Sequence, residues 1–218
     1  MNYKAVVFDL DGTLVDSAAD LGNAVNRVLS SHGYPIHEIP RYQDFIGSGA
    51  EIMVKRALPE DSRGEETVKI CLEQFLKDYH ENFDVDTVLY EGIPELLDHL
   101  SEKSIILTLL TNKPEGITLK LSESLLSKWD FQVIMGSREG LPKKPDPTGA
   151  VLLLEKIETP GSQTVYFGDS GIDMKTAVSA DMVPVGVLWG FRGKEELQND
   201  GAKYIIEKPL DILEIMQF

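Results

Sequence analysis

The chain has 218 residues, of which 42% are hydrophobic and 26% charged, a composition typical of a soluble globular protein with one domain or one domain carrying a smaller insertion. Its 21 basic and 36 acidic side chains give a formal net charge of −15, which argues against nucleic acid or an anionic membrane as a partner. The single cysteine excludes an internal disulfide and a thiolate metal cluster, and without a leader-like amino terminus we expect a cytoplasmic protein.

Short apolar runs, separated by stretches of helical length, indicate an α/β domain. The first run covers residues 6–8, and further runs cover 105–110, 132–135, 164–167, 183–187 and 204–206. Continuous rather than alternating hydrophobicity is typical of parallel strands that are covered on both faces. Amphipathic stretches lie at 94–100, 115–126, 148–156 and 172–180. This alternation predicts a doubly wound, Rossmann-like parallel sheet.

Residues 17–83 interrupt the alternation, because they show helical periodicity and no strand-like run. We expect Ser17 to be the N-cap of the first helix and Gly33 to end it. The stretch predicts an inserted all-helical cap domain that stands over the ends of the strands. Residues 1–16 and 84–218 then form the α/β catalytic core.

Two acidic residues, Asp9 and Asp11, follow the first predicted strand. Residues two apart on an extended chain point the same way, so both carboxylates are expected to face one site. Acidic groups at the end of a buried strand repel each other unless a cation lies between them. Ligands that are all oxygens select a hard ion such as Mg²⁺. The alternative is an acidic turn that caps the next helix.

Thr111 and Asn112 come at the end of the second core strand, where their side chains are suited to donate hydrogen bonds to phosphoryl oxygens. The alternative is that they cap the helix that begins near Pro114.

Lys143 and Lys144 precede a proline, which fixes the backbone and aims a side chain reproducibly. A lysine held in this way neutralises phosphoryl charge, whereas a pair of lysines more commonly forms a solvated basic turn.

Asp169 and Asp173 again follow an apolar strand. Asp169 is placed to complete a metal site with Asp9, and Asp173 to support that site from the next helical turn. The alternative for Asp169 is a helix N-cap.

In chain order, these segments resemble the motifs of the haloacid dehalogenase-like superfamily: Asp9-Leu10-Asp11-Gly12-Thr13-Leu14, Thr111-Asn112, Lys144-Pro145 and Gly168-Asp169-Ser170-x-x-Asp173. The resemblance covers nearly the whole chain, because residues 17–83 are similar to the C1-type cap of that superfamily. Within it, residues 15–21, 46–50, 111–114 and 189–191 are most similar to those of phosphoglycolate phosphatases.

The resemblance implies a role for each motif. Asp9 is implied to be the nucleophile that carries a transient aspartyl-phosphate, and Asp11 the general acid and then the general base. Thr111 and the backbone of Asn112 are implied to hold the phosphoryl group, and Lys144 to stabilise its charge, although Lys143 stays open as an alternative to Lys144.

The same likeness implies a Mg²⁺ site made by Asp9, Asp169 and the backbone carbonyl of Asp11, with Asp173 and Thr13 in support. The turn Gly47-Ser48-Gly49 is expected to lie against the substrate.

The expected activity is Mg²⁺-dependent hydrolysis of a small phosphorylated metabolite, with 2-phosphoglycolate as a candidate, by a monomer or homodimer. The alternatives are a phosphomutase like β-phosphoglucomutase, and a pyrophosphatase or 5′-nucleotidase of the same superfamily. A binding or regulatory protein on the same scaffold is a further alternative from outside the enzymes.

Overall fold

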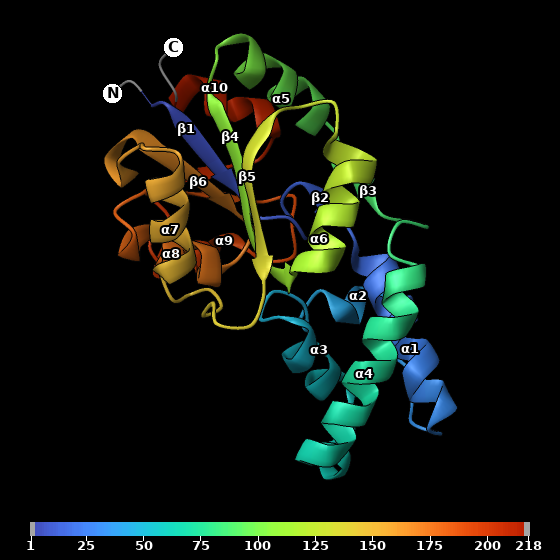
Figure 1. Cartoon of the computed structure of the whole chain (residues 1–218). Coiled ribbons are helices and arrows are strands. Elements are labelled where there is room, and N and C mark those ends of the chain that lie inside the picture. The colour runs from blue at the N-terminus through green and yellow to red at the C-terminus, as the bar shows by residue number, and fades with distance from the viewer. Residues whose placement is uncertain (1–2, 216–218) are drawn as a thin grey trace.

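A computed structural model describes residues 3–215 and shows a parallel sheet with helices on both faces (Figure 1). The strands of this sheet are β1 (Ala5–Phe8), β4 (Ile106–Pro114), β5 (Phe131–Ser137), β6 (Thr164–Gly168), β7 (Val183–Val187) and β8 (Tyr204–Ile206). Their order is β5-β4-β1-β6-β7-β8, and every pairing is parallel. The chain winds outward on one side of β1 and then on the other, which makes the carboxyl end of β1 a topological switch point. The predicted doubly wound α/β fold is confirmed.

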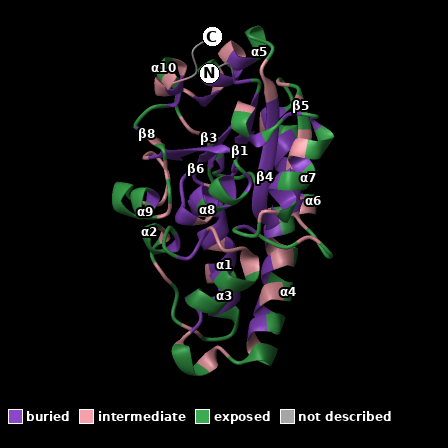
Figure 2. Ribbon diagram, turned by 90° about the vertical axis from the view of Figure 1, so that its left-hand side faces the viewer, coloured by how far each residue is buried: buried purple, intermediate pink, exposed green. Residues whose placement is uncertain are grey.

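Side chains of β1 alternate between two apolar layers. Val6 and Phe8 pack into one layer and Ala5 and Val7 into the other, and all four are fully buried. Figure 2 draws strand β1 in the colour of buried residues. The first layer is covered by α5 (Ile93–Glu102) and α6 (Glu115–Leu121), and the second by α7 (Thr148–Lys156) and α8 (Gly171–Ser179). Both faces of the sheet are therefore dry, which explains why the strands read as continuous apolar runs.

Helices α1 (Ala18–Ser31), α2 (Ile39–Tyr42), α3 (Ala50–Ala57) and α4 (Glu65–Glu81) lie beyond the carboxyl ends of the strands (Figure 1). The chain enters them after β2 (Val15–Asp16) and returns through β3 (Val88–Leu89), which pairs antiparallel with β2. These two-residue strands are too short to give a periodic signal, and the sequence did not predict them. Residues 17–83, all of which are described, contain helices and no strand. We propose that they act as a cap domain.

Some local predictions need correction. Ser17 occupies the N-cap position of α1, but its side chain makes no capping hydrogen bond and instead binds Asp11. The predicted helix 115–126 is α-helical only as far as Leu121 and continues as a π-helix over Ser122–Leu126. Gly33, with a φ of +71°, follows the end of α1 as expected.

Two alternative capping assignments are wrong. Strand β4 continues through Thr111 and Asn112, and Pro114 takes the N-cap position of α6. Ser170, rather than Asp169, is the N-cap of α8, where it forms a capping box with Asp173. Asp169 is thereby left to face the site.

The remaining helices are α9 (Lys194–Asn199) and α10 (Ile212–Ile215), with short 3₁₀ turns at Glu60–Ser62, Gly161–Gln163 and Pro209–Asp211. Among the described residues, no helix has the length and apolar character that a bilayer crossing requires.

Candidate active site

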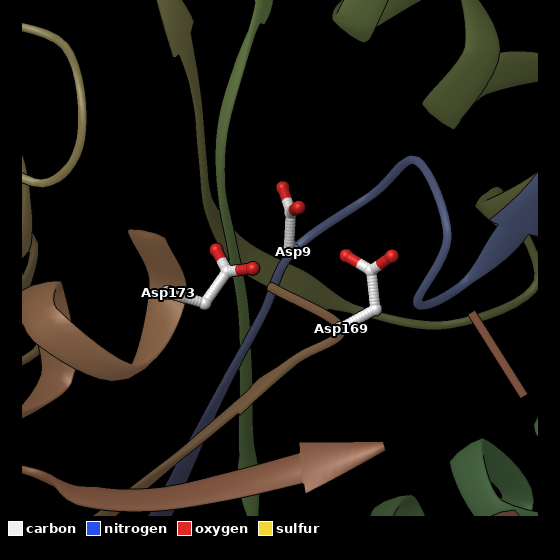
Figure 3. A group of neighbouring side chains, drawn as sticks. All are labelled: Asp9, Asp169 and Asp173. Carbon is white, nitrogen blue, oxygen red and sulfur yellow. The ribbon is translucent and has the colours of Figure 1, made fainter. Parts of the chain in front are cut away.

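Three carboxylates converge at the carboxyl edge of the sheet (Figure 3). Asp9 follows β1, Asp169 follows β6, and Asp173 lies in the first turn of α8. One oxygen from each lies within 4.8 Å of the others, and all three residues are buried. Asp9 and Asp169 meet because β1 and β6 are neighbours in register, with Phe8 opposite Phe167.

Burial raises the free energy of the ionised form of these carboxylates. It raises the pKa of Asp9 to about 6, even though the ammonium of Lys144 lowers it. Burial and the charges of Asp173 and Asp9 raise the pKa of Asp169 well above its usual range. The Oδ1 atom of Asp9 is buried, and apart from the Lys144 ammonium 2.9 Å away it has no hydrogen-bond donor among the described residues. Three crowded, buried carboxylates carry more negative charge than one ammonium offsets, which suits a hard divalent cation, so these residues are a suitable metal site.

Lys144 supplies positive charge to the cluster from the loop before α7. Its Nζ lies 2.9 Å from Asp9 Oδ1 and 2.5 Å from Asp173 Oδ1, and it donates to the hydroxyl of Tyr166 over 3.1 Å. Only 4% of the Lys144 side chain is exposed, whereas Lys143 is an exposed residue whose ammonium lies beside Gly49. The structure therefore places Lys144, and not Lys143, against the predicted nucleophile.

Asn112 holds the Lys144 backbone in place. Its side-chain amide donates to the carbonyls of Lys144 (3.0 Å) and Gly47 (3.1 Å), and its Oδ1 accepts from the Lys144 N–H (2.8 Å). Both amide N–H donors are used, so the sequence-based idea that this side chain binds phosphoryl oxygens does not fit the structure. Asn112 instead links β4, the lysine loop and the cap.

Asp11 belongs to a second set of contacts. Its Oδ1 accepts from the Ser17 hydroxyl (2.6 Å) and from Lys113 Nζ (2.8 Å), and Lys113 also donates to the Tyr79 hydroxyl (2.7 Å). Sequence reasoning assigned no function to Ser17, Lys113 or Tyr79. Lys113 directly follows Thr111 and Asn112, and two signals could have identified it: its place at the carboxyl end of a buried strand, and the similarity of residues 111–114 to phosphoglycolate phosphatases.

A cavity of about 40 Å³ lies between the core and the cap, and Asp9 and Asp11 both line it. The other lining residues are Leu21, Ile46, Gly47, Gly49, Ala50, Met53, Phe75, Tyr79, Thr111, Asn112, Lys113 and Pro114. Of the predicted cap turn, Gly47 and Gly49 line the cavity and Ser48 does not.

The loop after β7 joins the metal-site candidate to the cap. The backbone N–H of Phe191 donates to Asp169 Oδ2 over 2.7 Å, and the Arg192 guanidinium donates to the Ile46 carbonyl over 2.8 Å. The Trp189 indole donates to the carbonyl of Thr13 over 2.9 Å. The Thr13 hydroxyl is buried and has no partner among the described residues. Thr13 therefore contacts the loop after β7 through its backbone carbonyl. A role for its hydroxyl stays a prediction.

Comparison with known proteins identifies the family to which this chain belongs. A sequence model described as haloacid dehalogenase-like hydrolase matches residues 6–187. The chain belongs to this family. It is 33% identical over 208 residues to a phosphoglycolate phosphatase from Pseudomonas savastanoi pv. phaseolicola, covering 94% of this chain and 76% of that protein.

Comparison with solved structures supports the same family assignment. A candidate phosphoglycolate phosphatase from Lactobacillus delbrueckii subsp. bulgaricus superposes with a TM-score of 0.92 at 30% identity, over 99% of each chain. A haloacid dehalogenase-like family protein from Streptococcus pneumoniae superposes with a TM-score of 0.87 at 25% identity, again over 99% of each chain. With these relatives, the chain is a phosphatase of the haloacid dehalogenase-like family.

Proposed function

We propose that this phosphatase hydrolyses a small phosphate monoester through a phosphorylated Asp9, with Mg²⁺ as its metal ion and 2-phosphoglycolate as its substrate. The surroundings of the Oδ1 atom of Asp9 are the observation that supports this proposal most directly. This atom is buried, lies 2.9 Å from Lys144 Nζ, has no other hydrogen-bond donor among the described residues, and belongs to a residue that lines the cavity. A carboxylate oxygen held in this way is available to attack phosphorus.

In the proposed first step, an oxygen of Asp9 forms a bond to phosphorus while the bond from phosphorus to the ester oxygen breaks. Lys144 offsets the negative charge of both partners, since it already contacts Asp9 and is itself buried. Mg²⁺, held by Asp9 and Asp169 with Asp173 close by, would supply further electrostatic stabilisation of the phosphoryl oxygens.

Asp11 is the proposed proton carrier. It lies two residues after Asp9 and lines the same cavity. It would give a proton to the departing alkoxide, and then take one from the water that hydrolyses the phosphorylated Asp9. Its contacts with Ser17 and Lys113 hold the carboxyl in one position through both steps.

Two observations support 2-phosphoglycolate over larger esters. The curated relatives that match this chain at about 30% identity are named phosphoglycolate phosphatases. The cavity is also small and is lined on one side by the cap, which favours a compact substrate. The cytoplasm as the compartment, and a monomer or homodimer as the assembly, stay predictions.

Release of inorganic phosphate from 2-phosphoglycolate, sugar phosphates, nucleotides and pyrophosphate tests this function. We expect release from 2-phosphoglycolate with the highest kcat/KM, and complete loss of release with EDTA that is reversed by added Mg²⁺. Turnover of every ester at similar rates would contradict the substrate. Slow release to water together with fast transfer to a sugar phosphate would indicate a phosphomutase instead.

The metal site predicts a pH-dependent effect of Mg²⁺ on stability. The raised pKa values of Asp9 and Asp169 mean that the metal-free folded state binds more protons than the unfolded chain between about pH 4 and pH 6. Stability without metal should therefore fall as the pH rises through this window, as the crowded carboxylates ionise. Mg²⁺ competes with these protons, so it should raise the Tm by about 5 °C or more at pH 7.5 and much less at pH 5.

Differential scanning calorimetry with and without Mg²⁺ measures this effect, and the Asp169→Asn variant is the control that should lose it. An equal shift at both pH values, or an unchanged shift in the variant, would contradict a metal site at these carboxylates.

A further inference from the structure

The ammonium of Lys113 is a buried cation inside the substrate cavity, and the proposed chemistry leaves its ligand-binding capacity unused. Only 2% of its side chain is exposed, and the residue lines the cavity together with Asp9 and Asp11. Lys144, the other lysine of the site, is surrounded by Asp9 and Asp173. Among the described residues, Lys113 is paired with a single carboxylate, that of Asp11.

Lys113 has hydrogen-bonding capacity to spare. An ammonium group has three N–H donors, and the structure gives Lys113 two partners, Asp11 Oδ1 at 2.8 Å and the Tyr79 hydroxyl at 2.7 Å. Tyr79 comes from α4 of the cap, is itself buried, and its ring centroid lies 4.7 Å from Nζ. The Lys113 ammonium is thus held by Tyr79 of the cap and by Asp11 of the core, and its third N–H donor is left for a ligand.

Lys113 lies close to the place where the leaving group of the ester is expected to bind. In the proposed mechanism, Asp11 delivers its proton to the ester oxygen, so that oxygen must come within hydrogen-bond reach of the Asp11 carboxyl. Lys113 Nζ is 2.8 Å from the same carboxyl. A group one or two bonds beyond the ester oxygen therefore lies within reach of the ammonium.

The rest of the cavity wall favours an anion at this place over a hydroxyl-rich group. Beside Lys113 and Tyr79, the cap side is lined by the apolar side chains of Leu21, Met53 and Phe75. A sugar ring would need several polar partners there, and these side chains offer none. A carboxylate needs one strong partner, and a buried ammonium is such a partner.

We infer that Lys113, positioned by Tyr79, forms a subsite for an anionic group, a carboxylate close to the ester oxygen, on the leaving part of the substrate. This inference rests on the proposed phosphatase function and adds the residues that would recognise the carboxylate of a short phosphate ester. Lys113 would then determine substrate specificity by binding the carboxylate directly, and this role is separate from any effect of Lys113 on Asp11.

The test compares two esters of matched size on the same enzyme, 2-phosphoglycolate and 2-hydroxyethyl phosphate. For wild-type protein with Mg²⁺, kcat/KM should be at least about 100-fold higher for the carboxylate ester. In Lys113→Met, this preference should fall by at least about 10-fold, the size expected for one lost charged hydrogen bond. A disturbance of Asp11 slows both esters alike and cancels in the ratio.

Tyr79→Phe is the second variant, and it should reduce the preference by about fivefold, because it removes one of the two hydrogen bonds that position the ammonium. Lys128→Met is the matched control, since Lys128 is an exposed lysine before β5, at the opposite edge of the sheet. It should leave the preference unchanged.

The outcomes separate the two proposals. Hydrolysis of both esters by the wild type at similar kcat/KM, or an equal slowing of both in Lys113→Met, would overturn the carboxylate subsite and leave the phosphatase function in place. The absence of Mg²⁺-dependent release from either ester by the wild type would overturn the proposed function, and the subsite with it.

Discussion

Replacing Asp9 with asparagine is expected to lower kcat for phosphate release by at least about 10⁴-fold, because a carboxamide is a far weaker nucleophile toward phosphorus than a carboxylate. The same change removes one of the oxygens that hold the proposed metal ion. Steady-state release of phosphate at saturating Mg²⁺ measures the effect. A phosphorylated form of the parent enzyme, trapped by rapid acid quench, should be absent from the variant.

The structure predicts that this loss is chemical rather than structural. Burial already raises the pKa of Asp9 to about 6, so its charged form is costly in the metal-free fold. A neutral isostere removes the repulsion from Asp173 and from Asp169, although it also weakens the contact with Lys144. We therefore expect the Tm of Asp9→Asn without metal to stay within a few degrees of the parent.

Asp130→Asn is the matched control for this substitution, because Asp130 is exposed and precedes β5 at the far edge of the sheet. It should retain parental kcat and Tm. Parental turnover by Asp9→Asn would contradict the nucleophile assignment, and inactivity accompanied by unfolding would show that the residue is needed for the fold instead.

The sheet could be predicted from the sequence because a buried parallel strand leaves a continuous apolar trace. Residues 183–187 and 204–206 were predicted with the bounds that β7 and β8 have in the structure. The β2-β3 ribbon could not be predicted, since two residues per strand carry no periodicity. The π-helical turn after α6 was missed for a related reason, as it retains the helical spacing of its apolar residues.

The meeting of Asp9, Lys144 and Asp169 could be anticipated because residues that follow parallel strands share one edge of the sheet. The partners of Asp11 could not be anticipated in the same way. Tyr79 is 34 residues from Lys113 in the sequence and lies in a cap helix, and helical periodicity says which face is apolar but not which core residue that face meets. The roles of all these residues in catalysis stay predictions until the variants are measured.

Replacing Lys144 with methionine is expected to lower the free energy of unfolding by about 3–5 kcal/mol in metal-free buffer, because it leaves buried carboxylates without their counter-charge. Lys144 Nζ contacts Asp9 at 2.9 Å and Asp173 at 2.5 Å, and the Asp173 side chain has no exposed surface. Methionine is close to lysine in length and introduces no charge. Urea unfolding monitored by circular dichroism measures the loss. Lys143→Met, a change at the exposed neighbour, should alter stability by less than about 0.5 kcal/mol.

A double variant separates the structural effect of Lys144 from its catalytic effect. Asp173→Asn added to Lys144→Met removes one uncompensated charge, so it should recover about 1–3 kcal/mol of the lost stability. Activity should not recover, because the phosphoryl charge still has no ammonium to offset it, and kcat should stay about 10³-fold below the parent. Recovery of both stability and activity would show that Lys144 serves the fold alone. Recovery of neither would show that Asp173 is not the carboxylate that Lys144 stabilises, and that the ion pair with Asp9 dominates.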